Sequence, residues 1–174
     1  MEDEAGYREF AATRVAQLLR IAYLLCGDSY EAQDLVQTCL AKMYVAWPRI
    51  RDPDRVDAYA RQVLTRVYLS SKRLKRSGEI PMGRIPDAPG REVDPDLRLS
   101  LLEALRALPP RGRAVVVLRY LEDHSVETVA GMLDMTVPAV RSLNTRALAA
   151  LRGLLAEEPL FEPGPETHSS GLRP

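Results

Sequence analysis

The residues from Met135 to Arg152 have side chains suited to contact a nucleic acid. This stretch holds three arginines and no acidic residue, together with serine and threonine hydroxyls. Arginine donates paired hydrogen bonds to phosphates and to base edges, and hydroxyls bond to either. The chemistry indicated is recognition of a polyanion, with no covalent bond made or broken.

Apolar spacing predicts which of these residues face outward. The stretch has a helical period, with Thr136 as N-cap and Pro138 in the first turn, where a missing N–H removes no helical hydrogen bond. The apolar stripe faces inward, which leaves these residues outward: Pro138, Ala139, Arg141, Ser142, Thr145 and Arg146. Asn144 falls on the inward side, where we expect a backbone carbonyl to satisfy its amide.

A shorter helix precedes this one. Ser125 is placed to cap the segment VETVAGMLD, and a tight turn through Asp134 leads to Thr136. Short helix, tight turn and longer helix form the helix-turn-helix pattern, whose second helix enters the major groove of DNA. Small residues at the start of that helix let the backbone approach the bases.

A second base-rich region spans residues 49–76, with nine basic residues against three acidic ones. It begins with an Arg-rich, Pro-broken loop and continues as a helix whose predicted apolar side carries Val56, Ala60, Val63, Val67 and Leu74. Arg61 and Thr65 are predicted on the opposite side, with Tyr68 nearby. Arginines beside the Tyr68 ring suit the binding of single-stranded or locally opened nucleic acid, because arginines hold phosphates and aromatic rings stack on unpaired bases. The alternative for Tyr68 is a plain packing contact.

The segment from Asp28 to Ala46 predicts an amphipathic helix. Asp28 and Glu31 have capping-box spacing, and the apolar residues behind them recur at three and four. The outer face shows Asp34, Gln37 and Ala41, which is a candidate docking surface; an ordinary solvated face is the alternative.

The chain as a whole predicts an all-α fold. Two small helical domains, residues 1–76 and 97–156, are expected on either side of a flexible Pro/Gly-rich linker at 77–96. The second domain contains the helix-turn-helix, and residues 157–174 form a tail expected to be disordered.

Several classes of function lack support in the sequence. No apolar run is long enough to cross a membrane, and the acidic start has no layout of a secretion signal, which predicts a cytoplasmic protein. Cys26 and Cys39 lie in apolar stripes and are expected to be buried, reduced thiols. No metal-ligand spacing, phosphate loop or nucleophile motif is present, so we expect no metal, no cofactor and no enzyme.

Two stretches resemble the extracytoplasmic-function sigma factors of bacterial RNA polymerase. They are LLCGDSYEAQDLVQTCLAKMYVAW in the first domain and ALPPRGRAVVVLRYLEDHSVETVAGMLDMTVPAVRSLNTRALAALR in the second. The resemblance implies a subunit that binds core RNA polymerase and promoter DNA and directs transcription initiation. Members of this family are commonly held inactive by an anti-sigma protein, a further partner to consider here.

The resemblance also implies a role for particular residues. Those matching the polymerase-docking surface are Asp34, Gln37 and Thr38. Those matching the part that reads and opens the −10 element are Arg49, Arg51, Arg55, Tyr59, Arg61, Gln62, Thr65 and Arg66. Those matching or flanking the −35 reading positions are Pro138, Ala139, Arg141, Ser142, Thr145 and Arg146. The alternative function is a stand-alone helix-turn-helix regulator with an N-terminal sensing or dimerisation domain.

Overall fold

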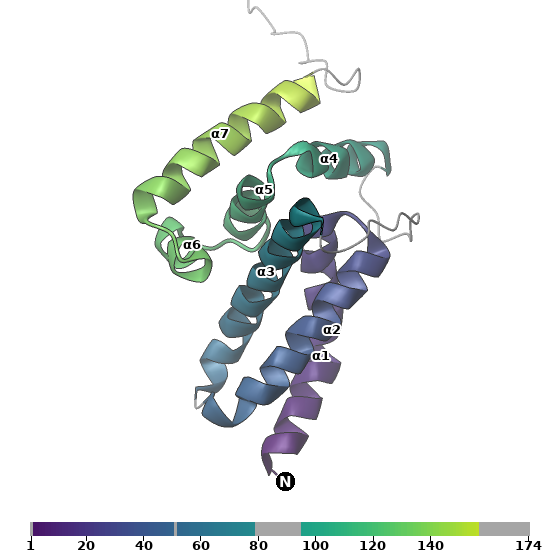
Figure 1. Cartoon of the computed structure of the whole chain (residues 1–174), viewed down its shortest axis with the longest axis vertical. Coiled ribbons are helices and arrows are strands. Elements are labelled where there is room, and N and C mark those ends of the chain that lie inside the picture. The colour runs from purple at the N-terminus through teal and green to yellow at the C-terminus, as the bar shows by residue number, and fades with distance from the viewer. Residues whose placement is uncertain (1, 51, 79–94, 157–174) are drawn as a thin grey trace, which may run out of the picture.

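The computed structural model describes residues 2–50, 52–78 and 95–156, and all regular structure in these ranges is helical (Figure 1). This confirms the predicted all-α class. The first half contains α1 (Glu2–Cys26), α2 (Ser29–Ala46), the short 3-10 turn η1 (Trp47–Arg49) and α3 (Pro53–Ser77). These three α-helices pack against one another and enclose the first apolar core.

The turn between α1 and α2 forms as the sequence predicts. Gly27 takes a φ of 72°, a left-handed conformation that glycine adopts without strain. The Asp28 carboxylate caps α2 by accepting a hydrogen bond from the backbone N–H of Glu31 at 2.8 Å. The Glu31 carboxylate, predicted to reach back to the cap, is paired with Lys72 at 3.0 Å and Lys75 at 3.1 Å.

The buried side of α3 agrees only in part with the predicted one. Val56 and Ala60 are buried as predicted, but the core stripe continues through Leu64 and Tyr68 instead of Val63 and Val67. Tyr68, predicted near the basic side, is completely buried, and this burial raises the pKa of its phenol to about 12. Two apolar stripes of similar strength lie side by side on this helix, and the larger side chains occupy the core.

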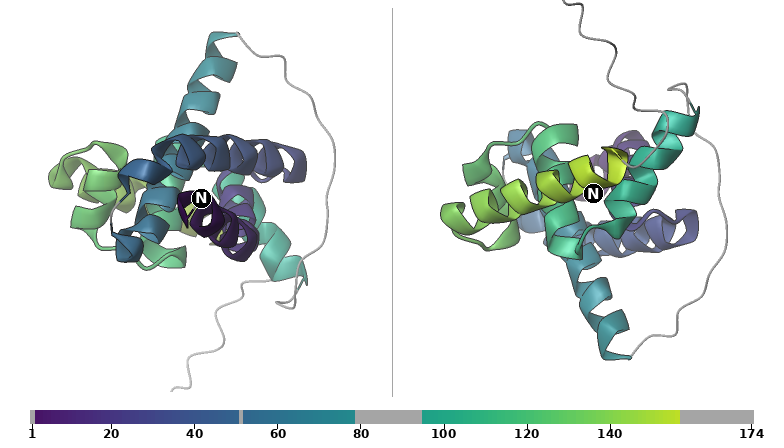
Figure 2. Two further views of the ribbon diagram at one scale, coloured as in Figure 1. Left: turned by 90° about the horizontal axis from the view of Figure 1, so that it is seen from below. Right: turned by 90° about the horizontal axis from the view of Figure 1, so that it is seen from above.

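The second half contains five helical segments. They are α4 (Pro95–Ala107), α5 (Pro110–Val116), the π-helical turn η2 (Val117–Leu121), α6 (Val126–Leu133) and α7 (Val137–Ala156). Pro110 begins α5, where a helix tolerates a residue without an N–H. Figure 2 shows α7 running across the molecule from the α6 side towards α4, and it packs on α4, α5 and α6.

The helix-turn-helix is confirmed in detail. The Ser125 hydroxyl caps α6 by accepting from the N–H of Thr128 at 3.0 Å, and Asp134 ends α6 with a left-handed φ of 52°. Thr136 then caps α7, since its hydroxyl accepts from the N–H of Ala139 at 3.3 Å. These contacts fix the angle at which α7 leaves the turn.

The two halves pack on each other. Ala114 and Val117 are fully buried in the same apolar cluster as the core residues of α1, α2 and α3. The buried Arg113 guanidinium donates to the carbonyl of Leu25 at 2.7 Å, which joins α5 to the end of α1. Most of the predicted linker, residues 79–94, and the whole tail, residues 157–174, lie outside the described residues.

Both cysteines are buried and free, as predicted. Burial raises the pKa of the Cys26 thiol to about 11 and that of the Cys39 thiol to about 12, so both are protonated at neutral pH. Across the described ranges, no helix combines the length and apolar character that a membrane span requires.

Candidate nucleic-acid interface

The outward face of α7 presents the side chains that the sequence predicted for it. Arg141, Ser142, Thr145 and Arg146 are exposed, as is Pro138, while Ala139 is half-buried. The inward face buries Val140, Ala147 and Leu151. The outward strip of α7 therefore carries arginines and no acidic residue, and the buried residues of the same helix hold it in place.

Hydrogen bonds within this strip stay local. The Thr145 hydroxyl donates to the carbonyl of Arg141 at 3.0 Å, and Arg146 Nε donates to the carbonyl of Ser142 at 3.4 Å. Arg141 lies 3.8 Å from the Glu127 carboxylate, with both side chains about two-thirds exposed. An exposed pair at this distance contributes little, so a phosphate or a base edge can displace it.

Asn144 has a different partner from the one predicted. Its Nδ2 donates to the hydroxyl of Tyr120 at 2.8 Å, and no backbone carbonyl within the described residues accepts from it. Asn144 is half-buried and its amide contacts η2, so its structural role stays a prediction. The prediction of a backbone partner is wrong.

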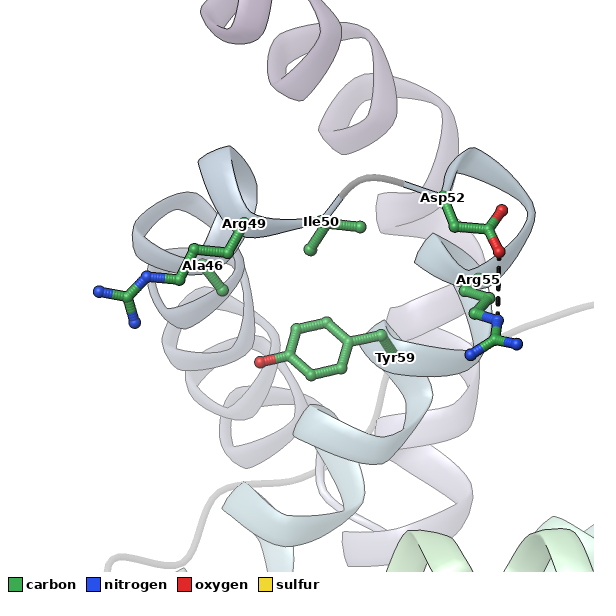
Figure 3. A pocket seen from close by; sticks show the side chains of 6 residues that line it. All are labelled: Ala46, Arg49, Ile50, Asp52, Arg55 and Tyr59. Atoms are coloured by element: carbon green, nitrogen blue, oxygen red, sulfur yellow. Dashed lines mark ion pairs between the residues drawn. The ribbon is translucent and has the colours of Figure 1, made fainter.

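A hollow of about 390 Å³ lies between the end of α2 and the start of α3 (Figure 3). Figure 3 shows the Tyr59 ring across it below Ile50, with Arg49 and Arg55 at opposite ends. Ala46 completes the apolar lining, and Arg55 is paired with Asp52 at 3.1 Å. The hollow thus brings together three of the predicted residues, Arg49, Arg55 and Tyr59. Arg51 lies outside the described residues.

This combination suits an unpaired base. An aromatic face stacks on a base of any identity, and a flanking guanidinium holds the phosphate of the same nucleotide. The volume falls within the range of about 300–1,000 Å³ that is typical of sites for small molecules. Tyr59 is 37% exposed, so its ring is accessible without any rearrangement.

The other predicted residues of α3 lie against the second half of the chain. Arg61 Nε is 2.8 Å from an oxygen of Glu122, and the Arg66 guanidinium is 2.9 Å from Asp134. Gln62 and Arg66 also donate to the carbonyls of Gly131 and Met132. The predicted basic face is therefore divided: one end borders the hollow, and the other contacts η2 and α6.

Thr65 corrects the sequence interpretation. It was predicted on the exposed basic side of α3, but it has no exposed surface, and its hydroxyl donates to the carbonyl of Arg61 at 2.8 Å. Thr65 follows the buried Leu64 in the chain, and neither side chain has exposed surface. In this conformation Thr65 cannot touch a ligand.

The outer face of α2 is exposed at every predicted docking position. Asp34, Gln37 and Thr38 all face solvent, whereas their neighbours Leu35, Val36 and Cys39 are buried. The face carries polar groups of modest size on a helix anchored by its apolar side. A partner protein can contact it without any change in the bundle.

Sequence patterns did not reveal two apolar residues and a buried arginine. Ala46 and Ile50 line the hollow, but both flank the irregular segment around Pro48, where periodicity gives no signal. Arg113 binds the carbonyls of Leu25, Arg106 and Leu108. Arg113 begins the apolar run RAVVVL. A charged residue next to such a run could have indicated a buried arginine with fixed partners, because a buried charge needs them.

Both halves of the chain match models of known protein families. Residues 12–77 match the model for Sigma-70 region 2, and residues 98–151 match the model for Sigma-70, region 4. The first match contains α2, α3 and the hollow between them, and the second contains the helix-turn-helix. The candidate interfaces thus lie inside the matched regions.

Individual relatives cover most of the chain. It is 38% identical over 155 residues to the RNA polymerase sigma-E factor of Streptomyces coelicolor, a match that covers 87% of each protein. It is 28% identical to the ECF RNA polymerase sigma factor SigE of Mycolicibacterium smegmatis, covering 87% of this chain and 62% of that protein. The fold is similar to that of the sigma factor RpoE of Bartonella quintana, which was solved in complex with the anti-sigma factor NepR. The TM-score is 0.72 at 20% sequence identity, and the match covers 88% of this chain and 98% of that one.

Proposed function

Because the chain belongs to the sigma-70 family of RNA polymerase sigma factors, in its extracytoplasmic-function group, we propose that three surfaces divide the work of promoter recognition. As a sigma factor the chain binds core RNA polymerase and promoter DNA, and it is not an enzyme. The alternative of a stand-alone regulator is not favoured, since the first domain matches sigma region 2.

The first surface is the outward strip of α7, which reads the −35 element. Its N-terminal part carries only small and basic side chains, so the helix can enter the major groove without steric or electrostatic conflict. Arg141 and Arg146 are exposed and have no strong acidic partner among the described residues. They are free to bond to guanine edges or to phosphates. The exposure of Arg141 and Arg146 is the observation that carries the proposal, because both arginines lie within the region 4 match.

The second surface is the hollow beside Tyr59, which takes an unpaired base of the −10 element. Promoter opening exposes single-stranded bases, and the cost of unstacking one is offset by stacking on an aromatic ring. Arg49 and Arg55 flank the ring and supply the positive charge that a strand backbone requires. Arg61, Gln62 and Arg66 extend this surface along α3 once the second half leaves them.

The third surface is the outer face of α2, which docks on core polymerase. Asp34, Gln37 and Thr38 are exposed in a row of one helical turn, on the opposite side from the core residues. Because core polymerase and promoters are in the cytoplasm, we infer that the chain works there. Control by an anti-sigma protein is inferred from the solved relative, whose complex contains one.

Binding to purified core polymerase tests the assignment of the docking surface. The variant Asp34→Arg with Gln37→Glu should lose co-purification with core enzyme while keeping its helical content and its melting temperature. The control Glu9→Arg with Gln17→Glu makes the same changes of charge on α1, at one exposed and one half-buried position, and should bind like the unmodified chain. Normal binding by the α2 variant would remove this surface from the proposal.

A further inference from the structure

A second hollow, of about 290 Å³, lies between the start of α1 and the start of α3. It is called the Trp47 hollow here, and its lining residues are Gly6, Glu9, Phe10, Thr13, Arg14, Trp47, Ile50, Val56 and Asp57. All of them belong to the first half of the chain. Figure 1 shows the start of α1 at the end of this bundle that is remote from α4. The hollow therefore does not depend on how the two halves pack.

Aromatic and aliphatic side chains form the floor of the Trp47 hollow. Phe10 and Val56 are buried, and Trp47 and Ile50 are half-buried. The centroid of the indole lies 5.3 Å from that of the Phe10 ring and 5.5 Å from that of the Tyr7 ring, and these contacts hold the indole in place. A fixed indole is a preformed surface for a flat ring or a planar cation.

Gly6 leaves space beside the indole. A methyl group built on Gly6 would lie 3.7 Å from the Cζ2 and Nε1 atoms of Trp47, which is an ordinary contact distance. Because Gly6 and Trp47 both line the hollow, a longer side chain at position 6 would extend into it. The room for a ligand thus depends on a glycine inside a helix, where alanine is the better helix former.

The charges around the Trp47 hollow favour a cation. Arg14 is paired with Asp57 at 2.8 Å, so these two charges compensate each other. Arg8, on the same helix, is paired with Glu4 at 2.6 Å. Glu9 is exposed and has no ion pair among the residues that the structure describes. An unpaired carboxylate beside an aromatic floor repels a phosphate and suits a cation with an apolar body.

Ile50 connects the Trp47 hollow with the hollow beside Tyr59. Its side chain lines both, and Figure 3 shows it above the Tyr59 ring. Ile50 lies in the short segment between η1 and α3. A ligand in the Trp47 hollow contacts Ile50 and can displace it only towards the remaining open space, which is the hollow beside Tyr59.

We propose that the Trp47 hollow binds a small organic cation with a planar apolar body and one amidinium or guanidinium group. The body lies on the floor formed by Phe10, Trp47 and Val56, and the cation donates paired hydrogen bonds to the Glu9 carboxylate. Through Ile50, the bound cation narrows the hollow beside Tyr59 and weakens the capture of an unpaired base. The site itself stands without the proposed function, whereas its effect on the base rests on it.

Fluorescence of Trp47 reports binding directly, because it is the only tryptophan of the chain. The probe is benzamidine, and benzamide, which has the same shape and no charge, is its neutral counterpart. Both are titrated into the full chain, with excitation at the red edge of the indole band. Benzamidine should change the emission saturably and bind about fivefold more tightly than benzamide, because only the amidinium pairs with Glu9.

Two pairs of variants test where the probe binds. Glu9→Gln should abolish the preference for benzamidine over benzamide, whereas the control Glu4→Gln removes an exposed carboxylate of α1 outside the hollow and should keep it. Gly6→Leu should fill the hollow and abolish binding of both compounds, whereas Gly6→Ala should retain it. Melting temperatures show whether the variants fold. The exposed Glu9→Gln exchange decides the question even if Gly6→Leu does not fold.

The effect on the second hollow is measured with a labelled single-stranded DNA of mixed sequence and about 10 nucleotides. Saturating benzamidine should weaken DNA binding about threefold, and saturating DNA should weaken benzamidine binding by the same factor. In Tyr59→Ala the two ligands should no longer affect each other.

An emission that does not saturate, a preference for benzamidine that survives Glu9→Gln, or binding that survives in a folded Gly6→Leu chain would overturn the site. DNA binding that saturating benzamidine leaves unchanged would overturn the coupling through Ile50. Equal DNA affinity of the unmodified chain and Tyr59→Ala would contradict the proposed function instead. The benzamidine titrations would then still decide whether the Trp47 hollow binds a cation.

Discussion

Asn144 on α7 donates a hydrogen bond to the hydroxyl of Tyr120 at 2.8 Å, although Tyr120 lies 24 positions earlier in the chain. The bond joins the recognition helix to the π-helical turn that follows α5. It engages the only amide side chain of α7, which lies outside the strip of Arg141, Ser142, Thr145 and Arg146. We therefore expect Asn144 to set the position of α7 and not to read a base.

Replacing Asn144 by leucine should leave promoter choice unchanged. The variant loses one hydrogen bond, while the half-exposed Tyr120 hydroxyl can bond to water, so the free energy of unfolding should fall by about 0.5–1.5 kcal/mol. Urea unfolding measures that loss, and transcription from promoters with single −35 substitutions measures the preference. A changed base preference would show that Asn144 contacts DNA.

Replacing Arg146 by alanine should weaken recognition of the −35 element by roughly 1–3 kcal/mol, because one paired contact with a base is lost. The control is Arg152→Ala, an exposed arginine further along the same helix. Affinity of the holoenzyme for promoters with and without the −35 element separates the two variants. Equal effects of both would mean that Arg146 supplies only general charge.

The hollow beside Tyr59 predicts a specific defect in strand opening. Tyr59→Ala should weaken the open complex by roughly 1–3 kcal/mol, since it removes the stacking surface, whereas Tyr59→Phe should keep it. Reactivity of unpaired thymines to permanganate reports opening directly. If the alanine and phenylalanine variants open promoters equally well, the ring does not hold a base.

The pH dependence of stability should depend on His124. Burial, followed by the nearby charge of Arg61, lowers the pKa of this imidazole below 6.5, while Glu122 and Asp123 act in the opposite direction. The unfolded chain therefore takes up the proton more readily, so stability present above pH 6.5 is lost as the pH falls towards the lower folded-state value.

Urea unfolding at about pH 7.5 and about pH 5.5 checks this for the unmodified chain and for His124→Gln. The loss of stability on acidification should be smaller in the glutamine variant, because carboxylate titration is common to both. An identical loss in the two chains would place His124 in an environment that does not disfavour its charge.

Local signals made the second half largely predictable from sequence. Ser125, Asp134 and Thr136 each act within three or four residues, so their roles as cap, turn and cap follow from residue type and spacing. Pro138 marks the start of α7 for the same reason. The exposed strip of α7 then follows from the helical period.

The buried side of α3 was predicted less well. Val63 and Val67 and the pair Leu64 and Tyr68 form adjacent stripes, and the period alone does not say which one the core selects. Tyr68 occupies the core because its ring fills more space there. Tyr59, one of the predicted −10 residues, is the aromatic side chain that lines the hollow.

The contact between the halves could not be predicted at all. The partner of Arg61 is 61 positions away, and that of Arg113 is 88 positions away. A segment rich in proline and glycine between the halves suggests independence, but it does not exclude packing. Such pairings depend on tertiary geometry, for which a single sequence carries no periodic signal.

Transcription by purified core polymerase tests the central claim most directly. Start sites are mapped on a genomic DNA library with and without the chain, at matched polymerase concentration. The account predicts start sites that appear only with the chain and share two upstream elements at a fixed spacing, while the free chain binds the same duplexes weakly. A chain that adds no start site, yet binds a duplex tightly and selectively by itself, would contradict it.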